Sequence, residues 1–375
     1  MISVLLVDDD AKVRAKLRRL LTAHADIAVV GEAAGGKEAV RLVQMLSPEV
    51  VVMDTDMPGM DGFETTLEIM TRKATPIIMV SPSQDEEKAE SGFRAMEAGA
   101  VALLAMPSGT GESHGRREAE LVQTVRTMSE VRVVHRRQRR QPGGATPAPG
   151  KAAAGGRATP ATRPPKSIVH APPTQAPIDL VVIGASTGGP QALYSVLVGL
   201  PRSFGAAVLV VQHITPDFQA SFVSWLGDAM QLPVALAADG ETLQRGRVFI
   251  APHPFQVGID RGRHIRLRDD PPESGLRPAV SYLFRSVAAV APRRTAAVLL
   301  TGMGQDGAAE LLELRSRGAI TIAQDEGTSI VHGMPGEAIR LGAAMHVLPP
   351  EEIGAFLAQL AAGPASGKGG RAGRA

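Results

Sequence analysis

Short apolar runs alternate with amphipathic segments in the first third of the chain. The apolar runs predict strands at Ile2–Val7, Ile27–Gly31, Val50–Met53, Ile77–Val80 and Val101–Leu104. Apolar positions at helical spacing predict helices such as Ala11–Leu21 and Phe63–Met70 between them. Strands that alternate with helices in this way are typical of a doubly wound, parallel α/β sheet.

A second alternating unit is predicted from Ile178 to about Ala362. Its predicted strands are Leu180–Ile183, Ala207–Val211, Arg247–Ala251, Ala296–Thr301, Ile320–Ala323 and Met345–Leu348. Its predicted helices are Gln191–Val198, Gln219–Met230, Val280–Val290, Gly307–Arg317 and Pro350–Leu360. A hairpin of Phe255–Asp260 and His264–Arg268 interrupts the series. We expect a second, largely parallel sheet whose strand C-termini build one site.

The composition changes between the two units. A helix predicted at Arg116–Met128 closes the first unit, and a short basic run, Arg136–Arg140, follows it. Gln141–Pro177 is rich in Pro, Gly and Ala and contains no acidic residue, which is typical of a flexible linker. We interpret the basic run as part of that solvated linker. The predicted domains are therefore 1–128 and 178–362, with a linker at 129–177 and a disordered tail at 363–375.

Overall composition excludes several classes of protein. Aromatic residues make up 3% of the 375 residues and the formal net charge is only +2, so nucleic-acid binding is not expected. The absence of cysteine excludes disulfides, thiolate metal sites and a cysteine nucleophile. No apolar segment is long enough to insert into a bilayer, and the N-terminus begins like a strand. We expect a cytoplasmic protein.

Carboxylates follow the predicted strands of the first unit. Asp8, Asp9 and Asp10 come after the first strand, Asp54 after the third, and Ser81 after the fourth. Because the C-terminal ends of parallel strands share one edge, these side chains are expected to meet. Crowded carboxylates repel one another unless a divalent cation lies among them, and oxygen ligands suit Mg²⁺. The alternative is that they only cap the helices that follow.

These motifs resemble those of the response-regulator receiver domain. The matching segments are Val7–Asp10, Met53–Gly62 and Ala98–Val101. The resemblance implies that Asp54 accepts a phosphoryl group, that Asp8 and Asp9 bind Mg²⁺ together with Asp54, and that Ser81 is the switch hydroxyl. One position departs from the family, because Met106 stands before Pro107 where a lysine is expected. Methionine cannot pair with a phosphoryl oxygen, so phosphorylation is expected to have little regulatory effect.

The loop from Gly184 to Pro190 carries the candidate chemistry of the second unit. It joins an apolar strand to a helix, and its Gly184-x-Ser186-x-Gly188 spelling is that of a nucleophile elbow. A hydroxyl at such a turn lies beside free backbone N–H groups. The loop also resembles a phosphate-binding turn, but Gln212-His213 stands where a dinucleotide site needs an acidic residue. Nucleotide binding is therefore the weaker interpretation.

A serine nucleophile needs a base and an acid that orients the base. His213 follows a strand, and His253 and His332 are rivals for the role of base. Asp306, in a glycine-flanked loop, competes with Asp325 for the role of acid. Each residue also has a structural alternative: Ser186 and Asp306 as N-caps, and His213 as a satisfied histidine at the sheet edge.

The second unit resembles the chemotaxis protein-glutamate methylesterase family, CheB. The matching segments are Ile183–Gly189, Val211–His213, Tyr282–Val287, Leu300–Gly307 and Gly333–Ala338. The resemblance implies Ser186 as nucleophile, His213 as base, Asp306 as orienting acid, and oxyanion contacts from the backbone near Thr187 and Met303. It also implies two linked domains, a flavodoxin-like receiver and a Rossmann-like methylesterase, both doubly wound and largely parallel.

The implied reaction is hydrolysis of glutamate methyl esters, and deamidation of glutamines, on chemoreceptors. The implied partners are methyl-accepting chemoreceptors as substrate and a chemotaxis histidine kinase as phosphodonor. Mg²⁺ is expected only at the receiver, and the protein is expected to be a monomer. Two alternatives stay open: a serine amidase or esterase of another target, and a docking protein with an inactive site.

Overall fold

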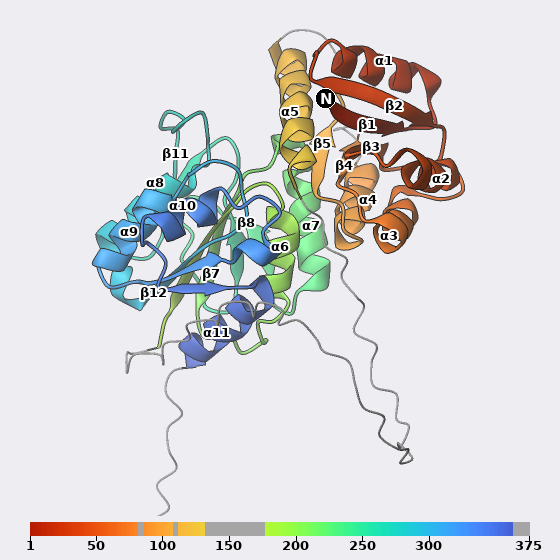
Figure 1. Ribbon diagram of the computed structural model, residues 1–375. Helices are drawn as coiled ribbons and strands as arrows, with labels where there is room; N and C mark the ends of the chain where they lie inside the picture. Colours follow the sequence, from red (N-terminus) through yellow and green to blue (C-terminus); the bar gives the residue numbers. More distant parts are fainter. Residues whose placement is uncertain (82–85, 108–111, 132–176, 363–375) are drawn as a thin grey trace, which may run out of the picture.

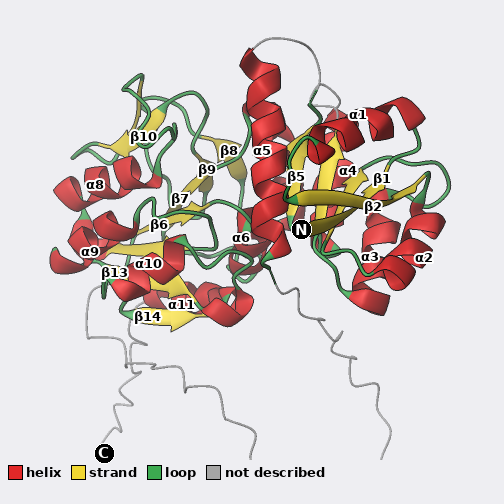
Figure 2. Ribbon diagram, turned by 45° about the horizontal axis from the view of Figure 1, so that its top comes forward, coloured by secondary structure: helices red, strands yellow, loops and turns green. Residues whose placement is uncertain are grey.

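The computed structural model describes residues 1–81, 86–107, 112–131 and 177–362 (Figure 1). The basic run 136–140, the tail 363–375 and nearly all of the predicted linker lie outside these residues. The described chain forms two α/β domains, each built on its own sheet (Figure 2).

The N-terminal domain is a five-stranded parallel sheet. Its strand order is β2-β1-β3-β4-β5, which places β3 at the centre between β1 and β4. Apolar residues that alternate along β1 pack on opposite faces: Leu5 and Val7 face one core, while Val4 and Leu6 face another. The strands are β1 (Ile2–Val7), β2 (Ile27–Ala33), β3 (Val50–Asp54), β4 (Ile77–Ser81) and β5 (Ala102–Ala105). The helices are α1 (Ala11–Thr22), α2 (Gly36–Leu46), α3 (Gly62–Lys73), α4 (Glu86–Glu97) and α5 (Glu112–Ser129).

The C-terminal domain is a seven-stranded parallel sheet of order β14-β13-β12-β6-β7-β9-β8. The central strand β6 is fully buried along its length, as expected for a parallel strand covered on both faces. The strands are β6 (Leu180–Ala185), β7 (Ala207–Gln212), β8 (Val234–Leu236), β9 (Val248–Ile250), β12 (Thr295–Leu299), β13 (Ile320–Gln324) and β14 (His346–Leu348). A separate antiparallel hairpin pairs β10 (Gln256–Ile259) with β11 (Ile265–Arg268).

Six α-helices in the described chain cover this second sheet. They are α6 (Gly189–Leu197), α7 (Gln219–Ala229), α8 (Val280–Val290), α9 (Ala308–Ser316), α10 (Met334–Arg340) and α11 (Pro350–Ala362). None of the helices in the described ranges is long and apolar enough to cross a membrane.

The two domains share an aromatic contact. Phe93 of α4 lies 5.6 Å from Phe222 and 5.4 Å from Trp225 of α7, measured between ring centroids. Trp225 also donates a hydrogen bond from Nε1 to Glu97, at 2.8 Å. The helix α5 lies between the two domains in both ribbon views (Figures 1 and 2). The N-terminal domain therefore packs on the C-terminal domain through α4 and α5.

The predicted fold class is confirmed, because both sheets are parallel and doubly wound. Every predicted strand is present, with ends that differ by at most two residues. The hairpin is also present, and the helix at Val280–Val290 has the predicted bounds. The helices α2, α4 and α10 and the strand β8 were not predicted from the sequence.

Candidate active site

Three neighbouring strands of the second sheet place the candidate catalytic residues together. The central strand β6 pairs with β12 on one side and β7 on the other. Ser186 follows β6 directly, His213 follows β7, and Asp306 lies in the loop after β12. The His213 N–H donates to the Ala185 carbonyl at 2.9 Å, which fixes the histidine beside the serine. Parallel strand order thus brings together three residues that are far apart in the sequence.

The turn at Ser186 is tightly packed. The Ser186 N–H donates to the Thr301 carbonyl at 3.1 Å, which ties the turn to β12. A Cβ at Gly302 would lie 2.7 Å from the Ser186 Cβ, so only glycine permits this approach. The N-cap of α6 is Gly188, in the left-handed conformation at φ 75°, and no side chain caps the helix. Ser186 is therefore not an N-cap, and that alternative is wrong.

His213 and Asp306 form a close ion pair at this edge of the sheet. The His213 Nε2 lies 3.0 Å from Asp306 Oδ2, and the two side chains are 12% and 9% exposed. This separation is within hydrogen-bonding distance. Because Nε2 faces the carboxylate, Nδ1 is the ring nitrogen left for the serine.

The N-terminus of α8 holds the Asp306 carboxylate. Its two oxygens accept hydrogen bonds from the Val280 N–H at 2.7 Å, the Ser281 N–H at 2.9 Å and the Ser281 hydroxyl at 2.5 Å. Burial alone would raise the pKa of Asp306, but the hydrogen bonds from His213 and Ser281 outweigh it and lower the pKa. The carboxylate therefore stays ionised beside the histidine. Asp306 does not cap α9, whose N-cap is Gly307.

Gln212 supports the turn from the neighbouring strand. Its buried side chain donates from Nε2 to the carbonyls of Ser186 and His213, both at 2.8 Å. A Cβ at Gly189 would lie 2.1 Å from Gln212 Oε1, so the turn closes directly on this amide. An amide at the end of β7 cannot replace the acidic residue that a dinucleotide ribose requires, so the nucleotide-binding alternative gains no support.

Two backbone groups are available for an oxyanion. Within the described residues, the N–H groups of Thr187 and Met303 donate no hydrogen bond. Both residues lie in the loops that flank Ser186, and the Met303 side chain is exposed. Free N–H groups at such a turn are suited to a developing negative charge.

The rival residues take other positions. His253 donates its backbone N–H to Gln219, and burial followed by the charges of Arg277 and Arg116 lowers its pKa. The Nδ1 of His332 lies 3.1 Å from the Ser329 hydroxyl, and Asp325 accepts from Thr328. Neither histidine lies within ion-pair distance of a carboxylate in the described structure, whereas His213 does.

Sequence reasoning missed Ser281 as a functional residue. Its hydroxyl contacts the Asp306 carboxylate and also accepts from the Gly307 N–H at 2.9 Å. Ser281 lies 25 residues before Asp306, and only the packing of α8 against the loop after β12 joins them. The one available sequence signal was a serine in the first turn of a predicted helix.

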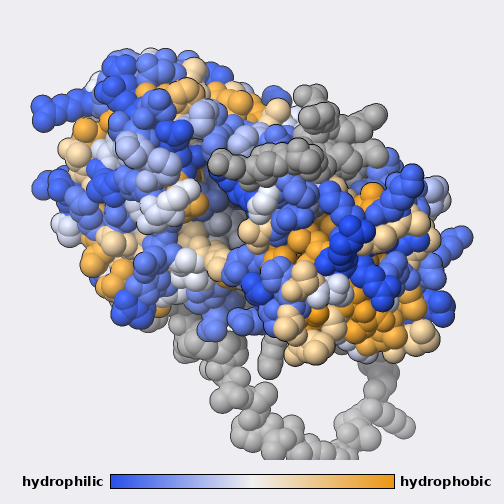
Figure 3. Space-filling model, turned by 90° about the horizontal axis from the view of Figure 1, so that it is seen from above, coloured by the Kyte–Doolittle hydropathy of each residue, from blue (hydrophilic) through white to orange (hydrophobic). Residues whose placement is uncertain are grey.

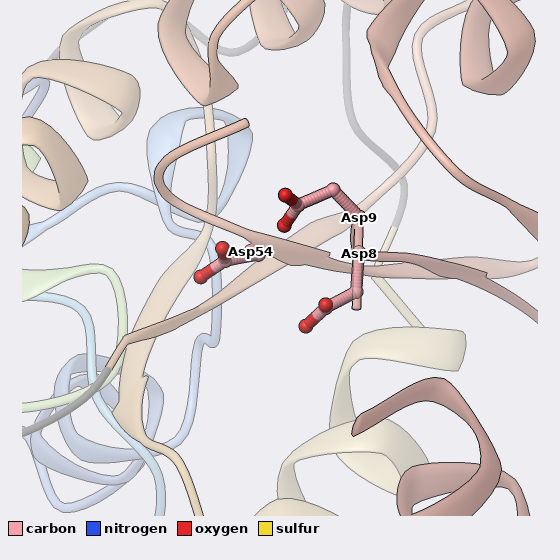
Figure 4. A group of neighbouring side chains, drawn as sticks. All are labelled: Asp8, Asp9 and Asp54. Carbon is pink, nitrogen blue, oxygen red and sulfur yellow. The ribbon is translucent and has the colours of Figure 1, made fainter. Parts of the chain in front are cut away.

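The receiver domain carries a second charged edge. The carboxylates of Asp8, Asp9 and Asp54 offer oxygens that all lie within 4.8 Å of one another. Figure 4 shows the three side chains as neighbours at this edge. Burial, followed by the charges of Asp9 and Asp10, raises the pKa of Asp8 against the hydrogen bond from the Asp10 N–H. Of the four aspartates Asp8, Asp9, Asp10 and Asp54, Asp10 alone is the N-cap of a described helix, and it accepts from the Lys12 N–H at the start of α1. The cap-only alternative therefore fails for the other three.

The switch region contains Ser81 and Met106. Ser81 is fully buried at the end of β4, and its hydroxyl lies 3.3 Å from that of Thr55. Met106 donates its backbone N–H to the Ser81 carbonyl at 2.8 Å and packs against the receiver core. The ammonium of Lys16 on α1 binds the Pro107 carbonyl. No lysine stands at position 106, as the sequence indicated.

The receiver contacts the loops that hold the catalytic residues. Thr127 of α5 donates to the sulfur of Met303 at 3.6 Å, and Arg117 donates to Asp217 at 2.6 Å. Ile330 packs against the receiver core and also lines Gly188, two residues from Ser186. The receiver therefore lies directly beside the entrance to the catalytic turn.

These two domains define a response regulator with a hydrolase output domain. Family models match both parts: the response regulator receiver domain over residues 4–114 and CheB methylesterase over residues 181–357. The protein-glutamate methylesterase/protein-glutamine glutaminase 4 of Geobacter metallireducens is 46% identical over 363 residues, which cover 96% of this chain and 99% of that protein. The corresponding protein of Nitrosospira multiformis is 44% identical, covering 96% of this chain and 98% of that protein. The chain belongs to the CheB methylesterase family.

Solved structures include relatives of each domain. The methylesterase catalytic domain of Thermotoga maritima CheB is 37% identical, with a TM-score of 0.48, over 49% of this chain and 100% of that chain. The response regulator domain of T. maritima CheB is 34% identical, with a TM-score of 0.32, over 36% of this chain and 99% of that chain. Family membership confirms the predicted enzyme class, a protein-glutamate methylesterase and protein-glutamine glutaminase with a receiver domain for its control.

Proposed function

We propose that Ser186, His213 and Asp306 hydrolyse glutamyl methyl esters of chemoreceptors by acyl transfer. The observation that carries this proposal is the His213–Asp306 pair, 3.0 Å apart, beside a serine on the adjacent strand end. A buried carboxylate whose pKa is lowered stabilises the imidazolium that forms when histidine accepts a proton.

The first half of the reaction transfers the acyl group. His213 takes the proton of the Ser186 hydroxyl as the serine oxygen bonds to the ester carbonyl carbon. The carbonyl electron pair moves to oxygen, where the N–H groups of Thr187 and Met303 donate to it. The C–O bond to the methoxy group then breaks, and His213 returns its proton to give methanol.

Water completes the cycle. His213 deprotonates a water molecule, which attacks the glutamyl–Ser186 ester and releases a glutamate carboxylate and the free serine. A glutamine side chain would follow the same course, because ammonia can leave in place of methanol. One set of residues therefore accounts for both activities in the names of the relatives.

We further propose that Asp54 is the phosphoacceptor of the receiver, with a chemotaxis histidine kinase as donor. The three carboxylates of Asp8, Asp9 and Asp54 fit Mg²⁺, because they supply oxygen ligands only and crowd like charges that a cation would relieve. Bound Mg²⁺ would neutralise charge between Asp54 and the incoming phosphoryl group. The buried Ser81 hydroxyl, on the adjacent strand, is positioned to respond.

Other expectations from the sequence stay predictions: no binding of nucleic acid, a monomeric state and a cytoplasmic location. The proposed substrate is tested by incubating the full-length protein with methylated receptors of its own organism and with unrelated methyl esters. We expect methanol from the receptors and little from the other esters. Efficient hydrolysis of the unrelated esters alone would assign the site to a different target.

A further inference from the structure

A basic groove lies between the β10–β11 hairpin and α8, outside the catalytic centre. Its volume is about 590 Å³. The polar side chains that line it are those of Asp260, Arg266, Arg268, Tyr282, Arg285 and Ser286. In Figure 3, hydrophilic residues predominate on the face that the catalytic domain, at left, turns to the viewer.

The pairing of the hairpin directs two arginines toward α8. Arg266 and Arg268 are two residues apart in β11 and so point to the same face. Arg266 pairs with Gly258, and a Cβ at Gly258 would lie 2.6 Å from the Ser286 hydroxyl of α8. The face that carries both arginines is therefore the face turned to α8. The missing side chain at Gly258 leaves the floor of the groove open.

Only one guanidinium of the groove lacks a partner in the described structure. Arg266 binds Asp260 at 2.6 Å, and Arg285 binds Glu273 and Glu310. Arg268 is exposed and makes no hydrogen bond or ion pair with any described residue. The neighbouring Tyr282 donates to Asp270 at 2.6 Å, and burial together with that bond raises its pKa to about 12. Tyr282 therefore stays neutral, and Arg268 presents a free positive charge.

The groove begins next to the catalytic centre. The first residues of α8, Val280 and Ser281, hold the Asp306 carboxylate, and Tyr282 follows them directly. Arg285 lies one turn further along the same helix, roughly 6 Å from Ser281 along the axis. A polypeptide whose ester enters the centre can therefore reach the groove with a side chain only a few residues away.

We infer that this groove binds a carboxylate side chain of the substrate polypeptide, close in sequence to the ester under attack, through Arg268. The inference rests on the proposed substrate, a protein that carries glutamyl methyl esters. Each hydrolysis converts a neutral ester into a glutamate carboxylate, so a segment with neighbouring sites becomes acidic as it is processed. A guanidinium binds a carboxylate through two parallel hydrogen bonds, which a neutral ester cannot match. The groove therefore favours sites whose neighbours are acidic.

The test uses the full-length protein and two peptides, each with one glutamyl methyl ester flanked by either glutamates or alanines. Wild-type protein is expected to show the lower KM for the glutamate-flanked peptide. Arg268→Ala should raise that KM about fivefold, with kcat and the KM for the alanine-flanked peptide unchanged. Arg268→Lys should raise the KM for the glutamate-flanked peptide by a smaller factor. Arg261→Ala, in the exposed turn of the same hairpin and outside the groove, is the matched control and should behave as wild type.

Three results would overturn the inference while leaving the proposed function in place. The first is that wild-type protein has equal KM values for the two peptides. The second is that Arg268→Ala raises the KM of both peptides equally. The third is that Arg261→Ala raises the KM of the glutamate-flanked peptide as much as Arg268→Ala does. If wild-type protein releases methanol from neither peptide, the proposed function itself fails, and this inference fails with it.

Discussion

Each domain places acidic residues at the C-terminal edge of its own parallel sheet, but the groups that surround these carboxylates differ between the two domains. In the catalytic domain, Asp306 receives hydrogen bonds from the start of α8 and faces His213, and its pKa is lowered. In the receiver, Asp8, Asp9 and Asp54 face one another, and the pKa of Asp8 is raised. The catalytic edge surrounds one carboxylate with hydrogen-bond donors, whereas the receiver edge gathers three carboxylates whose mutual repulsion a cation would relieve.

This difference matches the chemistry proposed for each edge. The catalytic edge acts on a neutral ester and must stabilise charge that appears only during reaction, so its donors are built in. The receiver edge must take up a phosphoryl group, so its charge is left for a cation to balance. Substitutions at the catalytic edge test whether its own groups suffice for the reaction, and phosphorylation of the receiver tests whether the two edges are coupled.

The largest effect is expected for Ser186→Ala. Loss of the nucleophile should lower methanol release from methylated receptor by at least about 10³-fold, because binding and oxyanion contacts alone supply little turnover. Thermal unfolding and circular dichroism should be unchanged. Ser195→Ala, further along α6, is the control and should keep full activity. Full activity in Ser186→Ala would contradict the assignment of the catalytic edge.

Gly302→Ala should disturb the same edge through packing. The new Cβ would lie 2.3 Å from the Met334 sulfur and 2.7 Å from the Ser186 Cβ, so the turn must shift. Overpacking of this kind costs about 1–3 kcal/mol, and we expect that loss in chemical denaturation together with lower kcat. At Gly227 of α7 an added Cβ meets nothing within 4 Å, so Gly227→Ala should not destabilise the protein. Equal stability of the two variants would show that the close approach is not required.

Ser281→Ala removes one of the hydrogen bonds that hold Asp306. The backbone donors of Val280 and Ser281 remain, so we expect kcat to fall by about tenfold rather than to vanish. The pH–rate profile should shift at its acidic limb, because the carboxylate supports the imidazolium less well. An unchanged profile with a reduced rate would assign Ser281 a packing role only.

The lowered pKa of Asp306 predicts a pH dependence of stability. A carboxyl group whose pKa is lower in the folded state stabilises that state fully above its unfolded value of 3.8, and this contribution is lost as the pH falls through the folded value. The difference in unfolding free energy between wild type and Asp306→Asn should therefore be constant near neutrality and shrink below about pH 4. A difference that persists unchanged at pH 3 would contradict the ionised carboxylate.

The smallest effect is expected from phosphorylation. Because Met106 cannot bind a phosphoryl oxygen, a small-molecule phosphodonor should change methanol release by less than about twofold. Met106→Lys should increase that response, since it adds a cation at the end of β5. Strong activation of wild type that disappears in Asp54→Ala would show that the receiver is coupled without this lysine.

The sequence was sufficient to predict both sheets and to nominate Ser186, His213 and Asp306 as candidate catalytic residues. Alternation of apolar runs with helical spacing gave the strands, because parallel strands are buried on both faces and need continuous apolar residues. Ser186, His213 and Asp306 could be placed at one edge of the sheet, because the C-terminal ends of parallel strands share an edge. The strand pattern left His253, His332 and Asp325 as rivals, and only the resemblance to the CheB family selected the three.

Contacts between elements could not be predicted. Ser281 contacts Asp306 only because α8 packs against the loop after β12, and a single sequence does not specify that packing. The receiver interface is similar: Phe93 and Trp225 are 132 residues apart, on helices of different sheets. The short strand β8 was missed although its residues Val234–Leu236 are apolar, because a run of only three residues directly after Pro233 does not distinguish a strand from a loop.

The central claim is that Ser186 is a nucleophile activated by His213, and labelling with a serine-reactive fluorophosphonate tests it most directly. In full-length wild-type protein, peptide mass spectrometry should find one adduct, on Ser186, and methanol release should fall in proportion to labelling. His213→Ala should be labelled much more slowly, and Ser195→Ala as fast as wild type. An adduct elsewhere, or a protein labelled on Ser186 that keeps its activity, would contradict the account.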